Sequence, residues 1–251
     1  MNPVVIRGLQ IGEGTPKICV PIVEKNEENI IETAKKILDS PADLVEWRAD
    51  WFEEIFDFNK VSYVLKNLRE ILGNIPILFT FRTKEEGGEK SINEAEYLEL
   101  SKKVIDSGYV DLIDIQVFQF QDITDELISY AHAIGTKVIV SNHDFQKTPK
   151  EEEIVFRLTM MQETGADILK MAVMPNSNRD VLSLLSATEK VVKDNVTKPV
   201  VTMSMSEKGM ISRIVGGTFG SAITFGTVGK ASAPGQFPAS ELKRILELLK
   251  G

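Results

Sequence analysis

The sequence predicts an α/β protein of the TIM (β/α)8 barrel class, with a β-hairpin ahead of the first barrel strand. Two observations carry this prediction. Short runs of β-branched apolar residues alternate along the chain with stretches of helical spacing, which is typical of βα units on a parallel sheet. Eight such pairs fit into 251 residues without a linker or a low-complexity tract, and a barrel of this class needs about 250 residues. We therefore expect residues 1–251 to form a single (β/α)8 domain.

Short apolar runs rich in β-branched residues mark the strands. The eight predicted strands are Lys17–Ile22, Leu44–Arg48, Ile75–Arg82, Val110–Val117, Lys137–His143, Asp167–Met174, Pro199–Met205 and Phe219–Phe225. Two shorter segments, Val4–Gly8 and Leu9–Gly12, precede them and predict a hairpin. In a barrel, this hairpin would plug the N-terminal end.

Helices are predicted between the strands, where apolar residues recur at helical spacing. They are Glu27–Leu38, Asn59–Leu72, Asn93–Ser107, Thr124–Ile134, a helix that begins at the acidic run Glu151–Glu153, Asn178–Lys193, Glu207–Val215 and Ala239–Leu249. The acidic run follows Thr148 and Pro149, which suits a helix start because Pro fits the first turn and negative charge favours the helix dipole. A doubly wound open sheet is the alternative, but no G-x-G-x-x-G follows the first strand, and such sheets rarely contain eight evenly spaced units.

The charge balance excludes several classes of function. The chain has 29 Lys and Arg against 37 Asp and Glu, a formal net charge of -8, so we expect no binding to nucleic acid or to an anionic membrane. Cys19 is the only cysteine, and His132 and His143 are the only histidines. This scarcity argues against an intrachain disulfide and against a Cys/His metal site. The sequence has no leader pattern and no long apolar run, so we expect a cytoplasmic protein.

Polar residues share one face of five consecutive predicted strands, near the C-terminal end of each. Side chains alternate between the two faces of a strand, so residues two apart lie on the same side. The residues on this shared face are Glu46, Arg48, Thr80, Arg82, Asp114, Gln116, Ser141, His143 and Lys170. A TIM barrel carries its active site at this end, so the pattern predicts a catalytic site in the barrel mouth.

Each of these residues also has an ordinary structural explanation. Lys170 fits a side chain that extends to solvent from an apolar strand, and His143 fits a polar strand end. Glu46 and Arg48 fit a structural ion pair, and the loop Glu85–Glu89 fits a solvated turn. The coincidence of five strands in the same phase is what favours a site over these separate explanations.

A lysine in a barrel mouth has the properties of a nucleophile. Burial disfavours its ammonium form, and we expect Arg48, Arg82 and Arg213 to disfavour that form further. The free amine attacks a ketone or aldehyde to give an iminium, which accepts electrons when an α-proton is removed. His143, on the neighbouring strand, is the natural proton carrier. Several arginines beside Glu46 indicate an anionic, hydroxylated substrate, with a phosphate left open.

Seven motifs with this chemistry occur in order along the chain. They are Glu46-Trp47-Arg48, Phe79-Thr80-Phe81-Arg82, Glu86-Gly87-Gly88-Glu89, Ser141-Asn142-His143-Asp144-Phe145, Lys170-Met171-Ala172-Val173-Met174-Pro175, Thr202-Met203-Ser204-Met205-Ser206 with Ile211-Ser212-Arg213, and Ser232-Ala233-Pro234-Gly235-Gln236. Through these motifs, and over nearly its whole length, the chain resembles the type I 3-dehydroquinate dehydratase family. The resemblance implies a metal-free TIM barrel without a cofactor, commonly a homodimer, that converts 3-dehydroquinate to 3-dehydroshikimate in the shikimate pathway of aromatic amino acid biosynthesis.

The resemblance also implies a role for each motif residue. Lys170 corresponds to the lysine that forms a Schiff base with the substrate ketone, His143 to the general acid and base, and Glu86 to the carboxylate that orients this histidine. The residues implied in substrate binding are Arg213 for the substrate carboxylate, Glu46, Arg48 and Arg82 for the ring hydroxyls, Ser232 and Gln236 on a loop that closes over the ligand, and Met203, Met205 and Phe225 on an apolar wall.

Two positions depart from the family pattern, and two other functions stay open. Pro21 stands where some members have Ser near the ligand, and Gln116 stands where members commonly have Glu. A class I aldolase-type Schiff-base lyase would share the barrel and the lysine, but would form its adduct with sugar phosphates. A catalytically silent barrel that serves as a binding module would bind substrate without turnover; the presence of both Lys170 and His143 speaks against it.

Overall fold

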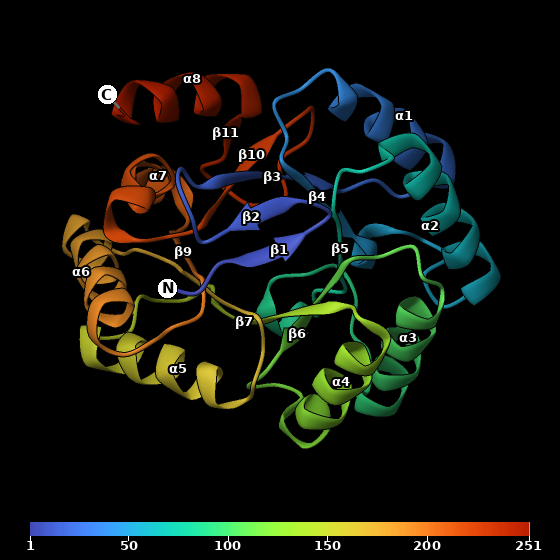
Figure 1. The fold of residues 1–251 in the computed structure, drawn as a ribbon, viewed down its shortest axis with the longest axis horizontal. Helices are drawn as coiled ribbons and strands as arrows, with labels where there is room; N and C mark the ends of the chain where they lie inside the picture. Colours follow the sequence, from blue (N-terminus) through green and yellow to red (C-terminus); the bar gives the residue numbers. More distant parts are fainter. Residues whose placement is uncertain (251) are drawn as a thin grey trace.

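A curled parallel sheet forms the centre of the molecule, and helices surround it (Figure 1). The structure is a computed structural model, and it describes residues 1–250. Within these residues, the order of strands in the sheet is β11-β10-β3-β4-β5-β6-β7-β8-β9. The strands are β3 (Lys17–Ile22), β4 (Leu44–Arg48), β5 (Ile77–Thr80), β6 (Leu112–Gln116), β7 (Lys137–Asp144), β8 (Ile168–Val173), β9 (Val200–Ser204), β10 (Ile223–Thr227) and β11 (Phe237–Pro238).

The sheet closes into a barrel between β9 and β10. Val200 and Ser221 form a parallel bridge, and the Ala222 N–H donates to the carbonyl of Val200 at 2.7 Å. The hydroxyl of Ser221 also accepts a hydrogen bond from the Thr202 N–H at 3.1 Å. The predicted TIM (β/α)8 class is confirmed.

Residues 1–250 contain eight α-helices, and these surround the sheet (Figure 1). They are α1 (Glu27–Leu38), α2 (Phe58–Leu72), α3 (Glu94–Asp106), α4 (Gln121–Ile134), α5 (Glu151–Glu163), α6 (Asn178–Asp194), α7 (Ser206–Val215) and α8 (Ala239–Lys250), with short 3-10 helices η1 (Ala49–Trp51), η2 (Lys84–Glu86) and η3 (Gly216–Phe219). Local caps define several starts; Asn93 and Ser177 each form a capping box with an acidic residue three positions later. No helix in residues 1–250 has the length and apolarity needed to cross a membrane.

Two apolar cores lie on the two sides of the sheet. The larger core fills the space between strands and helices and includes the buried rings of Trp47, Phe81 and Tyr97. The smaller core lies inside the barrel and includes β1 (Val4–Ile6) and β2 (Leu9–Ile11), the antiparallel hairpin. Val4, Ile6 and Ile11 of the hairpin pack on the first inward residues of the strands. The hairpin therefore plugs the N-terminal end, as predicted, and leaves the C-terminal end for a site.

The last barrel strand is the element whose prediction is wrong. The segment Phe219–Phe225 was expected to be extended, but η3 occupies its start and β10 begins only at Ile223. Gly220 has φ 101°, a left-handed conformation that turns the chain, and a Cβ there would lie 2.9 Å from Val192. The turn at Gly220 before β10 therefore depends on glycine and on packing, which an apolar pattern does not reveal.

Smaller differences occur at two other element ends. β5 ends at Thr80, so Arg82 lies just beyond the strand that was predicted to contain it. α4 starts at Gln121, three residues before the predicted Thr124, because Thr124 lies inside the helix and its hydroxyl donates to the Phe120 carbonyl at 2.7 Å. A Thr side chain can cap a helix start, but inside a helix it can instead donate to the carbonyl four residues earlier, as Thr124 does here.

Candidate active site

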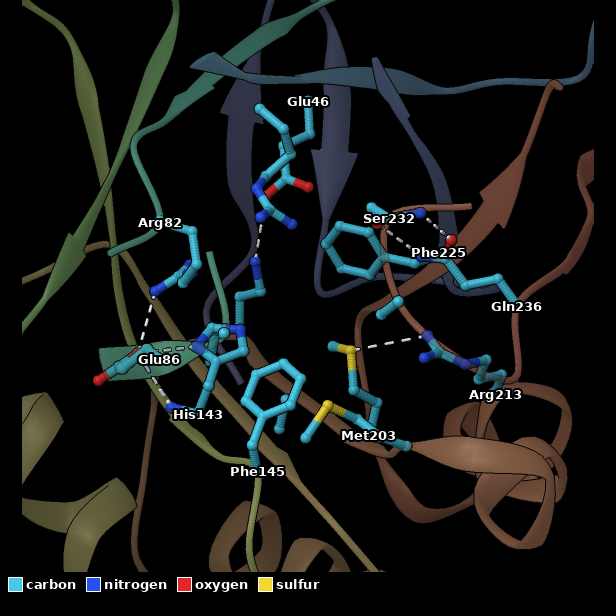
Figure 2. Close-up of a pocket in the computed structure, with 16 residues that line it drawn as sticks. Glu46, Arg82, Glu86, His143, Phe145, Met203, Arg213, Phe225, Ser232 and Gln236 are labelled. Carbon is cyan, nitrogen blue, oxygen red and sulfur yellow. Dashed lines mark hydrogen bonds and ion pairs between the residues drawn. The ribbon is translucent and has the colours of Figure 1, made fainter. Parts of the chain in front are cut away.

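A pocket opens at the C-terminal ends of the strands, and every residue with a predicted catalytic or substrate-binding role lines it (Figure 2). These residues are Glu46, Arg48, Arg82, Glu86, His143, Lys170, Met203, Met205, Arg213, Phe225, Ser232 and Gln236. They come from five strands (β4, β7, β8, β9 and β10), from η2 and α7, from the residues just after β5 and β9, and from the loop between β10 and β11. The shared phase along the strands thus places the predicted residues together in space.

Lys170 lies deep in the pocket, between two carboxylates. Its Nζ is 3.3 Å from Oε1 of Glu46 and 3.4 Å from Oδ2 of Asp114, and its side chain is 4% exposed. The ring of Phe225 lies below the amine, with its centroid 4.7 Å from Nζ. The expectation that arginines surround this lysine is therefore incomplete, because two carboxylates touch it directly and stabilise a positive charge at Nζ.

His143 and Glu86 form a second pair of polar groups in the pocket. Oε2 of Glu86 accepts from the His143 backbone N–H at 3.1 Å and lies 3.0 Å from Nδ1. Since Oε2 also accepts from the His143 N–H and from Arg82, we assign the proton of this contact to Nδ1, which leaves Nε2 free to accept a proton. Burial, and then the positive charges of Arg82 and Lys170, hold the pKa of His143 well below its usual value. The imidazole is therefore neutral at pH 7 and ready to accept a proton.

Glu86 is a carboxylate near its point of titration at neutral pH. Burial raises its pKa to about 7, and Arg82 opposes that rise. η2 places this side chain, and Gly87 and Gly88 follow it. A Cβ at Gly87, whose φ is 81°, would lie 2.3 Å from the ring of Phe145, and a Cβ at Gly88 would lie 1.8 Å from the Arg82 carbonyl. Glu86 is thus buried against the site, whereas Glu85, Gly87 and Glu89 of the same loop are exposed to solvent.

Arg82 connects several charged groups below the pocket. Its NH1 donates to Glu86 at 3.1 Å and to the Ser141 hydroxyl at 2.9 Å, and its NH2 donates to Asp114 at 2.8 Å. Although burial opposes it, Arg82 together with Lys170 holds the pKa of Asp114 below its usual value. Arg82 therefore makes three hydrogen bonds to other side chains of the protein, which hold Glu86, Ser141 and Asp114 in place.

Arg48 is held by a carboxylate that sequence reasoning missed. Its Nε and NH2 donate to the two oxygens of Asp50, both at 2.8 Å, so an ion pair with Glu46 is not formed. Asp50 is fully buried and also accepts from the backbone N–H groups of Arg82 and Glu89, both at 3.2 Å. The sequence signal for this ion pair was the position of Asp50, an acidic residue two positions after the inward-facing Arg48.

Arg213 is a buried cation without a carboxylate partner in the part of the chain that the structure describes. NH2 donates to the Pro234 carbonyl at 3.4 Å, NH1 contacts the Met203 sulfur at 3.7 Å, and Nε has no partner there. Burial lowers its pKa to about 10, which leaves it charged at neutral pH. Such a cation at the edge of a pocket suits an anionic ligand.

The loop after β10 covers one side of the pocket. Its two predicted residues bond each other: the Ser232 N–H donates to Oε1 of Gln236 at 2.9 Å, and Nε2 of Gln236 donates to the Ser232 hydroxyl at 3.0 Å. Through Pro234, the same loop contacts Arg213. Met203 and Phe225 form an apolar side of the pocket (Figure 2), and Met205 also lines the pocket.

The two departures from the family pattern lie beside the pocket, outside its lining. Pro21 is opposite Glu46 in the register of β3 and β4. The Oε1 of Gln116 accepts from the Thr83 backbone N–H at 3.2 Å, so Gln116 supports the start of η2 and does not contact Lys170. Gly87, Phe145, Ala172 and Ala233 also line the pocket; they belong to the quoted motifs, but no role was predicted for them.

Comparisons with known proteins agree with this geometry. The family model for type I 3-dehydroquinase matches residues 18–251. The 3-dehydroquinate dehydratase of Clostridioides difficile is 50% identical over 244 residues, 97% of this chain and 96% of the relative, and that of Bacillus licheniformis is 48% identical with the same coverage.

Solved structures give the same result. The crystal structure of a type I 3-dehydroquinate dehydratase from Clostridium difficile with covalently modified comenic acid superposes with a TM-score of 0.96 at 49% identity, covering 99% of this chain and 98% of that one. The 3-dehydroquinate dehydratase of Geobacillus kaustophilus also has a TM-score of 0.96, at 36% identity, with coverage of 99% and 96%. On the evidence of its pocket, its motifs and these relatives, the chain belongs to the type I 3-dehydroquinase family.

Proposed function

We propose that this hydro-lyase removes water from 3-dehydroquinate to give 3-dehydroshikimate through a Schiff base on Lys170. The observation that carries this proposal is the placement of a buried lysine, held between Glu46 and Asp114, in one pocket with a neutral His143 and an unpaired Arg213. These are the groups that an imine-forming dehydration of an anionic ketone needs.

Arg213 binds the substrate carboxylate in this proposal. Its buried guanidinium has free donors, and the loop at Pro234 holds it toward the pocket. Arg48 and Glu46 face the ring hydroxyls, and Asp50 fixes Arg48 in place. Arg82 reaches the pocket but is held by three protein groups, so we assign it mainly to organising the charges around Glu86 and Asp114.

The reaction begins at the amine of Lys170. Once Nζ has given a proton to His143, its lone pair attacks the ketone carbon, and the resulting carbinolamine loses its oxygen as water to form an iminium. Glu46 and Asp114 stabilise the positive charge that the iminium carries. Since both lie within 3.4 Å of Nζ, they favour the charged imine over the neutral one.

His143 then carries out the proton transfers of the elimination. Its neutral imidazole takes the α-proton, and the C–H electrons move into the iminium to give an enamine. The enamine expels the β-hydroxyl, which leaves as water with the proton that His143 returns. A further water hydrolyses the product imine and frees Lys170. Glu86 stabilises the imidazolium because its Oε2 faces Nδ1.

A direct assay tests this function. Addition of 3-dehydroquinate to the purified protein is expected to raise the ultraviolet absorbance of an enone at a steady rate. His143→Ala should lower kcat by about 10² to 10⁴, the range for loss of a general acid and base. Binding of 3-dehydroquinate without an absorbance rise in the native chain contradicts the proposal and favours a silent binding module.

We further propose a cytoplasmic homodimer in which residues 1–251 form one (β/α)8 domain. The family resemblance supports it, and so do the exposed apolar side chains of Phe156 and Met160 on α5 and Leu182 on α6, which are 58%, 47% and 59% exposed. Light scattering on a sizing column should give twice the mass of the 28.0-kDa chain. A mass of one chain at micromolar concentration contradicts the dimer.

A further inference from the structure

Asn142 links the catalytic carboxylate to a helix outside the barrel. It follows Val138 and Val140 on the helix-facing side of β7, where the neighbouring side chains are apolar, and it is 8% exposed. Both ends of its amide have partners: Nδ2 donates to Oε1 of Glu86 at 3.4 Å, and Oδ1 accepts from NH1 of Arg157 at 3.0 Å. Arg157 lies on α5, so this amide connects α5 with the pocket.

The two oxygens of Glu86 are satisfied very differently. Oε2 accepts from the His143 backbone N–H and from Arg82, and it faces Nδ1 of His143. Oε1 accepts from Asn142, and no other donor reaches it in the described residues. Loss of the Asn142 bond would therefore leave one buried carboxylate oxygen without a partner, which disfavours the ionised form.

Arg157 decides which way the Asn142 amide points. A guanidinium only donates hydrogen bonds, so NH1 selects the orientation with Oδ1 toward α5 and Nδ2 toward Glu86. Arg157 is itself fixed, because its Nε donates to Glu153 at 2.7 Å and its guanidinium lies 5.9 Å from the centre of the Phe118 ring. Without Arg157, the amide is free to rotate, and one of its two orientations places Oδ1 against the carboxylate.

We propose that Arg157 acts through Asn142 as a positioning residue that keeps Glu86 ionised and correctly rotated beneath His143. This inference rests on the proposed function only in that Glu86 serves the proton transfers of His143. Because burial already brings the pKa of Glu86 to about 7, loss of one hydrogen bond changes its ionisation within the working pH range. The charged groups that face the Glu86–His143 pair from the surrounding elements are Arg82, Asp114, Lys170 and Arg48, and all of them are kept in the variants below.

The test compares Arg157→Met, Asn142→Leu and the double variant with the native chain. The first measurement is the pH profile of kcat; the second is the midpoint of the Glu86 carboxyl carbon in a ¹³C NMR titration, with Glu86→Gln used to identify that resonance. Both single variants should move the acidic limb and the midpoint upward by about 0.5 to 1 pH unit. The double variant should match Asn142→Leu alone, because Arg157 acts through Asn142.

Arg244→Met is the matched control. Arg244 on α8 also pairs with a glutamate one turn earlier, Glu241, at 3.2 Å and is exposed, so this variant loses the same charge and should keep the native midpoint. Arg157→Lys, which retains a cationic donor, should recover at least part of the shift. If Asn142→Leu does not fold, the comparison of Arg157→Lys with Arg157→Met tests by itself whether Arg157 affects the Glu86 midpoint.

A native Glu86 midpoint in Arg157→Met, or shifts that add in the double variant, would overturn the proposal. The NMR titration needs no turnover. A chain that is inactive on 3-dehydroquinate but shows the shifts would therefore fail the proposed function and still support the link from Arg157 to Glu86.

Discussion

At the scale of single residues, hydrogen bonds and ion pairs connect the charged groups of the site in a continuous network. Asp114 accepts from Lys170 and Arg82, and Arg82 in turn donates to Glu86, which holds His143. The charged groups in this network thus influence one another, so the charge of one affects the protonation of the next. The protonation state of His143, the proposed general base, follows from this whole set of contacts.

The ionisation of Glu86 predicts the acidic limb of the pH profile. Burial raises its pKa to about 7, whereas the pKa of His143 is lowered and the imidazole stays neutral through that range. The ionised carboxylate is the form that accepts from Nδ1 of His143, so kcat should be half-maximal near pH 7, reach its plateau more than about one unit above, and fall below pH 7. In Glu86→Gln, kcat should be lower and should no longer fall with pH in this range. An unchanged acidic limb would assign the titration to another group.

Gln116→Glu tests the departure from the family pattern. The amide oxygen of Gln116 accepts from Thr83, and its buried Nε2 has no partner in the described residues. A carboxylate keeps the acceptor and removes the unpaired donor, so steady-state kinetics should show kcat/KM changed by no more than about tenfold, or roughly 1.4 kcal/mol. A native chain that is inactive until Gln116→Glu restores turnover would contradict this expectation.

At the scale of elements, the strand phase was predictable and the side-chain partners were not. The bounds of β3, β4 and α1 agree with the sequence pattern because apolar runs and a local Asn26 cap define them. The period of two along strands then places the inward residues correctly. Asp50 and Arg157 were missed because their partners depend on how a loop and an outer helix approach the strands, which no local pattern encodes.

The loop Gly229–Pro238 is predicted to act as a lid. Its Gly- and Pro-rich sequence is long for a connection between a barrel strand and its helix, and it contacts the site through Pro234 and Arg213. The ammonium of Lys230 lies 3.9 Å from the centre of the Trp51 ring, which holds the loop against η1. Hydrogen exchange at Ala231 to Phe237 should slow with saturating ligand while α1 is unchanged. Equal exchange with and without ligand would show that the loop does not close.

At the scale of the whole molecule, one end of the barrel supplies stability and the other supplies chemistry. The hairpin fills the N-terminal end with apolar side chains, whereas the charged groups gather at the C-terminal end. The sequence predicted this division because the hairpin is apolar and the polar residues follow the strands toward their C-terminal ends. The closure between β9 and β10 was less predictable, since it depends on Ser221 and the glycine turn before it.

Ile11→Ala tests the structural role of the plug. Ile11 is fully buried, so its truncation should lower the free energy of unfolding by about 2 to 5 kcal/mol in a denaturant titration. Val5→Ala on the same hairpin is the control: Val5 is 54% exposed, and its truncation should cost less than about 0.5 kcal/mol. Both variants should keep the native KM. A raised KM in folded Ile11→Ala would show that the plug also shapes the site.

The central claim is that Lys170 is the nucleophile of this barrel, and borohydride trapping tests it most directly. Reduction of the protein in the presence of 3-dehydroquinate, followed by peptide mass spectrometry, should add the mass of the reduced ligand to one peptide, the one that contains Lys170. Lys170→Ala should give no adduct, while His143→Ala should still give some, because Lys170 supplies the nucleophile and loss of His143 slows imine formation without abolishing it. An adduct on another lysine, an adduct with sugar phosphates in place of 3-dehydroquinate, or continued turnover without an adduct would contradict the account.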